Sequence, residues 1–182
     1  FLCLFCSLCC FRCCFLKCFR KAVLLTSVVF QLILLSLYPD WKSKTQYKIG
    51  KSAVIRGGKD ITLVTWGAML HVALQAANEL TNQGIEVEII DVRTILPFDA
   101  ETCVSSVLRT GRLVILQEGQ WFGGIGHSMQ SRILEETFYS LESAPLVIGA
   151  LDTPVPFAPQ LENHTIPSVD HVVEAIQMMI DS

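Results

Sequence analysis

Several polar side chains directly follow apolar runs that the sequence predicts to be strands, and they are the first candidates for chemistry. Asp91 and Arg93 follow one run, Glu118 a second and Asp152 a third. Two carboxylates beside an arginine can move protons or hold a cation. No nucleophile–base pair or metal-binding constellation accompanies them, so we favour a structural network that fixes loops and predict no catalytic or metal-binding residue. Its expected members are Asp91, Arg93, Thr94, Asp99, Glu118, Gly124 and Asp152, with Trp66 and Gly67 at the same edge of the sheet.

A glycine-rich stretch, residues 119–126, follows a predicted strand and precedes a predicted helix. This geometry can offer backbone N–H groups to an anion. However, the stretch matches neither G-x-G-x-x-G nor a phosphate-binding loop that ends in Gly-Lys-Ser/Thr. A tight turn with close packing of helix on strand explains the glycines more simply, and nucleotide binding remains the less favoured alternative.

The histidines and the single cysteine of the C-terminal part do not form a recognisable site. His71, His127, His164 and His171 are scattered, and we expect surface or capping roles for them. Cys103 falls among valines on a predicted helix and is expected in the core. Neither a Ser-His-Asp arrangement nor an H-E-x-x-H motif is present in the sequence.

The elements that position these residues are strands that alternate with helices. Runs rich in β-branched residues predict strands at 61–65, 87–91, 113–116 and 146–150. Helical periodicity predicts helices at 69–80, 99–111, 125–141 and from 169 onward, with Asp99 and Ser168 as N-caps and Gly84 and Gly111 as C-terminal stops. Residues 47–59 are expected to be irregular and 153–167 to form a loop. This order predicts a three-layer α/β domain, with a mostly parallel sheet flanked by helices.

The composition of the first 38 residues differs sharply from that of the rest. They contain seven of the eight cysteines, four Lys or Arg and no acid, whereas residues 39–182 hold all 17 acids and a formal charge of −7. Such an acidic domain gives no support to nucleic-acid binding. We therefore separate an apolar, Cys-rich segment and linker (1–46), either non-native or disordered or helical, from a domain at 47–182. Translated non-coding sequence, a membrane segment at 22–38 and a targeting peptide all remain open for the first part, and the initial Phe1 suggests a fragment.

Five segments, read together, resemble one family. They are DITLVTWGAM (60–69), GIEVEIIDVRTILPFD (84–99), TGRLVI (110–115), EG followed by GGIG (118–119 and 123–126), and LDTPVPFA (151–158). In this order they are similar to the C-terminal domain of the transketolase-like beta subunit of pyruvate and branched-chain 2-oxo acid dehydrogenases. The likeness covers residues 47–182.

The resemblance implies an assembly role for this chain. Family members are heterotetramers of two alpha and two beta subunits, with thiamine diphosphate between alpha and the N-terminal domain of beta, so we expect no cofactor residue and no turnover here. The expected partners are the alpha subunit, a second beta subunit and the dihydrolipoyl acyltransferase core. By the same resemblance Glu142, Asp181 and Ser182 would dock that core, while Val147 stands where many relatives have Arg.

The sequence is also compatible with other functions. The domain could be a stand-alone small-molecule or nucleotide-binding module, or residues 22–38 could tether it to a membrane. The segment DTPVPFAP (152–159) is more similar to the pyruvate or acetoin branch than to the branched-chain branch. The family and the single cysteine of the domain suggest the mitochondrial matrix, with plastid or bacterial cytoplasm as alternatives.

Overall fold

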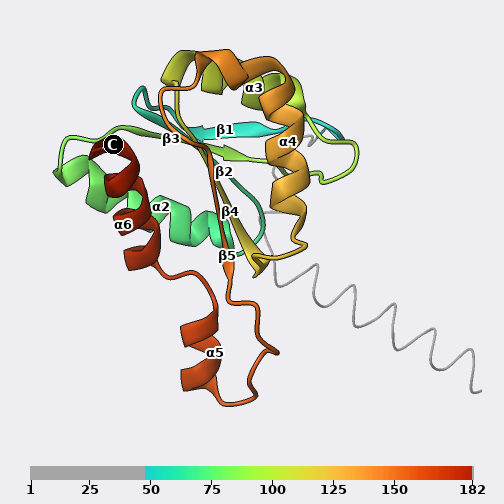
Figure 1. Cartoon of the computed structure of the whole chain (residues 1–182), viewed down its shortest axis with the longest axis vertical. Coiled ribbons are helices and arrows are strands. Elements are labelled where there is room, and N and C mark those ends of the chain that lie inside the picture. Colours follow the sequence, from blue (N-terminus) through green and yellow to red (C-terminus); the bar gives the residue numbers. More distant parts are fainter. Residues whose placement is uncertain (1–47, 182) are drawn as a thin grey trace, which may run out of the picture. The chain divides into compact units, whose positions relative to one another are not determined.

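The computed structural model describes residues 48–181 (Figure 1). The expectations for residues 1–46 and for Ser182 therefore lie outside the described residues. The elements in chain order are β1 (Ala53–Arg56), β2 (Ile61–Thr65), α2 (Met69–Asn82), β3 (Val87–Asp91), α3 (Ala100–Thr110), β4 (Leu113–Gln120), α4 (Ile125–Thr137), the 3-10 helix η2 (Phe138–Ser140), β5 (Leu146–Ala150), α5 (Pro159–Thr165) and α6 (Val169–Asp181). None of these helices is long and apolar enough to cross a membrane.

Within residues 48–181 the strands form one mixed sheet in the order β1-β3-β2-β4-β5. β3, β2, β4 and β5 run parallel, and β1 joins the edge of the sheet antiparallel to β3. Every residue of β2 is buried, as expected for a strand that is covered on both faces. The predicted α/β fold with a mostly parallel sheet is confirmed.

Helices cover both faces of the sheet (Figure 1). Side chains alternate along a strand, so Ile61, Leu63 and Ile89 pack under α2 and α6. Val64 and Ile90 point the other way and pack with residues of α3 and α4. Cys103 is fully buried in this second cluster, as the sequence predicts. The predicted three layers are thus two helix pairs with the sheet between them.

The helix ends follow the predicted signals, with one exception. Gly84 and Gly111 have φ of +86° and +68°, the left-handed conformation that suits glycine after a helix. The Ser168 hydroxyl accepts a hydrogen bond from the His171 amide at 3.3 Å and caps α6. Asp99 stands at the N-cap position of α3, but its side chain makes no capping bond to the helix backbone. Its carboxylate instead accepts hydrogen bonds from the Ser52 amide and from the Thr102 hydroxyl.

Three boundaries were wrong in the sequence interpretation. β1 lies inside 47–59, because four residues on a sheet edge leave too short a pattern to recognise and pairing with β3 decides their conformation. α5 occupies seven residues of the predicted loop 153–167, and Pro159 opens it at a position where proline is favoured. α4 ends at Thr137, and η2 continues the chain to Ser140.

Candidate functional site

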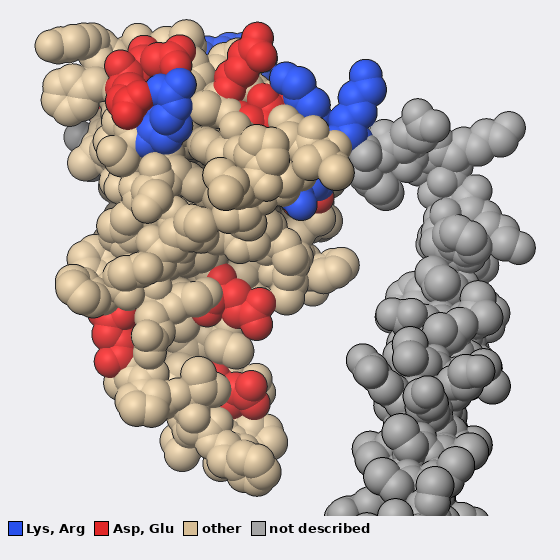
Figure 2. All heavy atoms as spheres, turned by 90° about the vertical axis from the view of Figure 1, so that its right-hand side faces the viewer, with Lys and Arg blue, Asp and Glu red and all other residues tan. Residues whose placement is uncertain are grey.

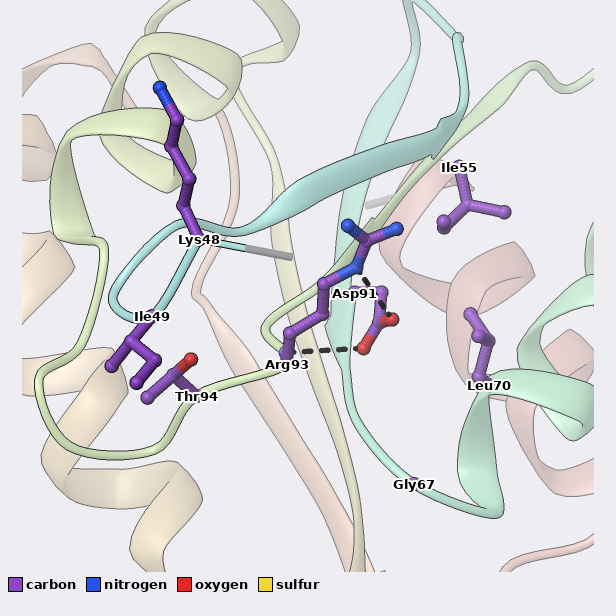
Figure 3. Close-up of a pocket in the computed structure, with 8 residues that line it drawn as sticks. All are labelled: Lys48, Ile49, Ile55, Gly67, Leu70, Asp91, Arg93 and Thr94. Atoms are coloured by element: carbon purple, nitrogen blue, oxygen red, sulfur yellow. Dashed lines mark hydrogen bonds and ion pairs between the residues drawn. The ribbon is translucent and has the colours of Figure 1, made fainter. Parts of the chain in front are cut away.

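The carboxyl ends of the parallel strands do not form one site, because the polar residues there separate into two hollows. The first has a volume of about 680 Å³ and lies beside the ends of β2 and β3. Its lining residues are Lys48, Ile49, Ile55, Gly67, Leu70, Asp91, Arg93 and Thr94 (Figure 3). The second has a volume of about 360 Å³ and lies beside β5. Asp152 lines this second hollow, and Glu118 is exposed and lines neither of the two.

In the first hollow, Asp91 and Arg93 bind each other (Figure 3). The Asp91 carboxylate accepts the Arg93 amide at 3.2 Å and its Nε at 3.4 Å. Arg93 has a φ of +57°, and the bond to its own amide stabilises this unusual turn after β3. The Thr94 hydroxyl accepts the Gly50 amide at 3.2 Å and so ties the chain before β1 to the same turn. These contacts of Asp91, Arg93 and Thr94 therefore hold the turn after β3 and the chain before β1 in place.

In the second hollow, Asp152 joins two loops. Its carboxylate accepts the Phe122 amide at 2.8 Å, and the side-chain amide of Gln120 donates to the Thr153 carbonyl at 2.9 Å. The loop after β4 and the loop after β5 are therefore held together at their bases. Trp121 adds an edge-on contact to the His127 ring, with centroids 4.9 Å apart.

The glycine-rich turn is organised by Gln117, which the sequence interpretation missed. Gln117 is buried at the end of the apolar part of β4. Its Oε1 accepts the Gly126 amide at 2.8 Å and its Nε2 donates to the Gln120 carbonyl at 2.7 Å. A Cβ on Gly124 would lie only 1.9 Å from that Nε2, so position 124 has no room for a side chain. A polar residue that ends an apolar strand before a glycine turn was the available signal.

These contacts decide what the turn offers to an anion. The Phe122 amide binds Asp152, the Gly126 amide binds Gln117, and the His127 amide binds the Gly124 carbonyl at 3.4 Å. A diphosphate group needs several such amides at once, and here they bind groups of the protein itself. The contacts of these three amides fit the packing interpretation of the turn.

A second buried polar cluster was also missed. Glu88 on β3 has a side chain that is only 4% exposed, and it forms an ion pair with Arg109 of α3. Its Oε1 also accepts the Ser106 hydroxyl at 2.5 Å, and Ser106 in turn bonds the Thr62 hydroxyl of β2 at 2.7 Å. The cluster connects α3 to two strands. An acid inside the apolar strand 87–91 was the signal that pointed to a buried pair.

Asp99 and Cys103 have shifted pKa values with different physical causes. Burial opposes ionisation of Asp99, but hydrogen bonds from the Ser52 amide and the Thr102 hydroxyl, together with the Lys51 charge, outweigh it. The pKa of Asp99 is therefore lower than that of an ordinary aspartate. Burial, with a smaller effect of the Asp99 charge, raises the pKa of the Cys103 thiol to about 12. This thiol is a packing group with very little thiolate at neutral pH.

The expected docking residues lie elsewhere in the domain. Glu142 precedes β5, at the opposite end of the strands from the two hollows. Its carboxylate binds Arg112 at 2.8 Å, and its side chain is 60% exposed. Asp181 is exposed at the end of α6, and Ser182 is outside the described residues. Val147 is buried in the core of β5. Among residues 48–181 no three His, Cys, Asp or Glu side chains gather as metal ligands.

Comparison with known proteins identifies the family to which this arrangement belongs. The family described as "Transketolase, C-terminal domain" matches residues 50–172. The chain belongs to this family. A transketolase C-terminal domain is the fold that the resemblance implied, with the parallel sheet between two helix layers described above.

Relatives of this transketolase C-terminal domain include beta subunits of the pyruvate dehydrogenase E1 component. The subunit from Rickettsia felis is 41% identical over 128 residues, which are 70% of this chain and 39% of the relative. The subunit from Rhizobium meliloti is 43% identical over 129 residues, 71% of this chain and 28% of the relative. The chain therefore spans well under half the length of these relatives. A solved structure, an inactive β4 tetramer of a split-gene transketolase, matches 75% of this chain and 44% of its own, with a TM-score of 0.63 and 29% identity.

Proposed function

We propose that this chain carries the C-terminal domain of the beta subunit of a thiamine-diphosphate-dependent 2-oxo acid dehydrogenase, and that this domain serves assembly. The enzyme of which it forms part would oxidatively decarboxylate a 2-oxo acid, pyruvate in our proposal, and transfer the acyl group to lipoyl. The observation that carries the proposal is the identity of 41% to 43% with pyruvate dehydrogenase beta subunits across most of the domain.

The chemistry of the described residues supports assembly over catalysis. The amides of the glycine-rich turn bind the protein's own Asp152 and Gln117, and Asp91 is paired with Arg93. These groups are engaged within the domain itself, which is consistent with a role in assembly. In our proposal the cofactor belongs to the alpha subunit and the other beta domain.

We further propose that Glu142 and Asp181, together with Ser182, dock the acyltransferase core. Opposite charges steer such encounters, and both acids are exposed. Because Glu142 is paired with Arg112, its contribution to docking should be modest. We propose the mitochondrial matrix as the compartment, a suggestion supported by the basic, acid-free first 38 residues.

The proposal is tested by purifying the chain with and without the alpha subunit of a pyruvate dehydrogenase. We expect a stable complex on size-exclusion chromatography, and no release of carbon dioxide from pyruvate by the chain alone. Decarboxylation by the purified chain alone, or failure to bind any alpha subunit, contradicts the proposal.

The docking residues need a separate measurement against the peripheral binding domain of the acyltransferase. Glu142→Gln should weaken binding by up to about fivefold, the range of an exposed ion pair. Glu174→Gln, which removes an exposed acid on the same domain, serves as the matched control and should leave the affinity unchanged. Equal effects of the two variants would show that Glu142 has no specific docking role.

A further inference from the structure

The first turn of α6 is closed by two side chains, each of which binds the other residue's backbone. The Ser168 hydroxyl accepts the His171 amide at 3.3 Å, and the His171 Nδ1 accepts the Ser168 amide at 3.5 Å. This reciprocal arrangement is a capping box, in which the third residue of the helix is ordinarily Glu or Gln. Here that position holds a histidine, so one of the two bonds depends on the protonation state of an imidazole.

The His171 Nδ1 accepts the Ser168 amide only while it carries no proton, so the hydrogen of the neutral ring is on Nε2. Protonation adds an N–H at Nδ1, and two donors then face each other. It also places a positive charge at the amino end of α6, where the helix dipole disfavours cations. Both effects oppose the capped turn, and histidine side chains change their charge between about pH 5 and 8.

The charged and titratable groups around His171 belong to α6 itself and to the elements that pack near it. They are Asp170 and Glu174 on α6, Asp152 after β5, His164 on α5, and His71 and Glu79 on α2. Asp152 and His164 line the second hollow together with His171, whereas His71 and Glu79 do not line it. The nearby acids attract a protonated His171, and a protonated His164 repels it.

The attraction by the acids is weaker than the loss of the cap. Residues 143–181 contain five acids and no Lys or Arg, and Figure 2 shows acidic and no basic side chains on the lower part of one face of the domain. The Asp152 carboxylate already accepts the Phe122 amide, and a pair three residues apart on an exposed helix face, such as His171 with Glu174, contributes little. Salt screens such exposed charges, whereas the lost hydrogen bond and the helix dipole act within the first turn.

The capped turn holds the junction between α5 and α6 beside the second hollow (Figure 1). Thr165 and Pro167 of this junction line the hollow with His171. The Thr165 carbonyl accepts the Leu151 amide at 3.0 Å and so joins the junction to the end of β5. A change in the first turn of α6 is therefore transmitted to one wall of the hollow.

We infer that Ser168 and His171 form a pH-sensitive cap, which holds the junction between α5 and α6 at neutral pH and releases it in mild acid. Its stabilising effect is complete above the pH range in which histidine titrates in an unfolded chain and is lost as the pH falls through that range. Val172 and Val173 follow the cap and are buried, so the rest of α6 stays packed when the first turn opens. The inference is independent of the proposed function.

The test compares the full chain with His171→Gln, because glutamine at this position keeps the capping box and takes up no proton. Melting temperatures are measured at about pH 7.5 and about pH 5.5, in about 0.15 M salt to screen exposed charges. The two proteins should melt together at the higher pH, and the parent protein should lose about 3 °C more than His171→Gln on acidification. His164→Gln is the matched control, since it removes the other histidine of the hollow, and it should respond to acid as the parent does.

Hydrogen exchange shows whether the effect is local to the first turn. Corrected for the intrinsic effect of pH, the protection of the Ser168 and His171 amides in the parent protein should fall about fivefold in acid, the usual effect of losing an N-cap partner. Ser168→Ala should lack this protection at both pH values. An equal acid response of the parent protein and His171→Gln overturns the inference, and so does a response that His164→Gln abolishes.

Discussion

The contact between Gly124 and Gln117 gives the sharpest test of how the domain is held together. In Gly124→Ala the new Cβ would lie 1.9 Å from the Gln117 Nε2 and 2.6 Å from the Gln120 carbonyl oxygen. The Gln117 side chain is buried and must leave its place, which breaks its bonds to the Gly126 amide and the Gln120 carbonyl. A buried polar group without a partner costs about 1–3 kcal/mol, so we expect a loss of about 3 kcal/mol in the free energy of unfolding.

The measurement is urea unfolding followed by circular dichroism, with Gly119→Ala as the control. A Cβ at Gly119 meets nothing within 4 Å, so this variant of the same turn should stay within about 0.5 kcal/mol of the parent protein. Backbone strain would not explain a loss of stability in Gly124→Ala, because Gly124 has a φ of −69°, which alanine adopts freely.

A double-mutant cycle decides whether Gln117 is the cause. Gln117→Ala alone should cost about 2 kcal/mol through its lost hydrogen bonds. In Gly124→Ala/Gln117→Ala the nearest clash is gone, although the contact with the Gln120 oxygen remains. The double variant should therefore be more stable than the sum of the single effects by about 1 kcal/mol or more. Strict additivity, or a Gly124→Ala variant as stable as Gly119→Ala, refutes the reasoning.

Three further outcomes are expected. The pKa of Asp99 is lowered in the folded state, so the ionised carboxylate stabilises the fold above the ordinary carboxyl pKa, and this effect is lost as the pH falls through the lowered value. In urea unfolding, Asp99→Asn should therefore have a lower free energy of unfolding than the parent protein at neutral pH. The difference should shrink as the pH falls below roughly 4. Burial raises the pKa of Cys103 to about 12, so mass spectrometry of the peptide that contains it should show iodoacetamide adducts only after unfolding, and rapid native labelling would contradict its burial. Glu88→Ala should lower the unfolding free energy by about 2 kcal/mol, because it removes the hydrogen bond from the Ser106 hydroxyl and the ion pair with the half-exposed Arg109, while Ser106 keeps its bond to Thr62. A loss below about 0.5 kcal/mol would contradict this role of Glu88.

Much of the fold was predictable because local patterns and tertiary packing agree. β2 and β3 are short runs rich in β-branched residues, each preceded by a glycine a few residues upstream, and their burial in the parallel sheet matches their composition. β1 was not predictable, because AVIR carries no alternation that distinguishes a strand from a loop. Its place on the edge depends on β3 and on Ser52, whose amide binds Asp99 at a sequence distance of 47 residues.

The sequence predicted which polar residues lie at the carboxyl ends of the strands, but it did not predict that they separate into two hollows. Asp91 and Arg93 bind each other because they are two residues apart on one turn. Asp152 instead binds the Phe122 amide, a backbone group that no side-chain pattern identifies. The number of partners within reach of each carboxylate depends on how far each loop extends past its strand, and the sequence does not encode that length in any local signal.

The distribution of polar contacts among the described residues is consistent with the assembly role that we propose for this domain. Gln117, Glu88 and Asp99 are buried, and each has its hydrogen-bonding groups satisfied by neighbouring elements. Groups held in this way fix the loops but are not available to a substrate. The side chains of Val155, Phe157 and Leu161 are the opposite case, since most of their apolar area faces solvent. Because association removes exposed apolar area from water, a domain built in this way gains more from binding another protein surface than its satisfied polar groups would gain from binding a substrate.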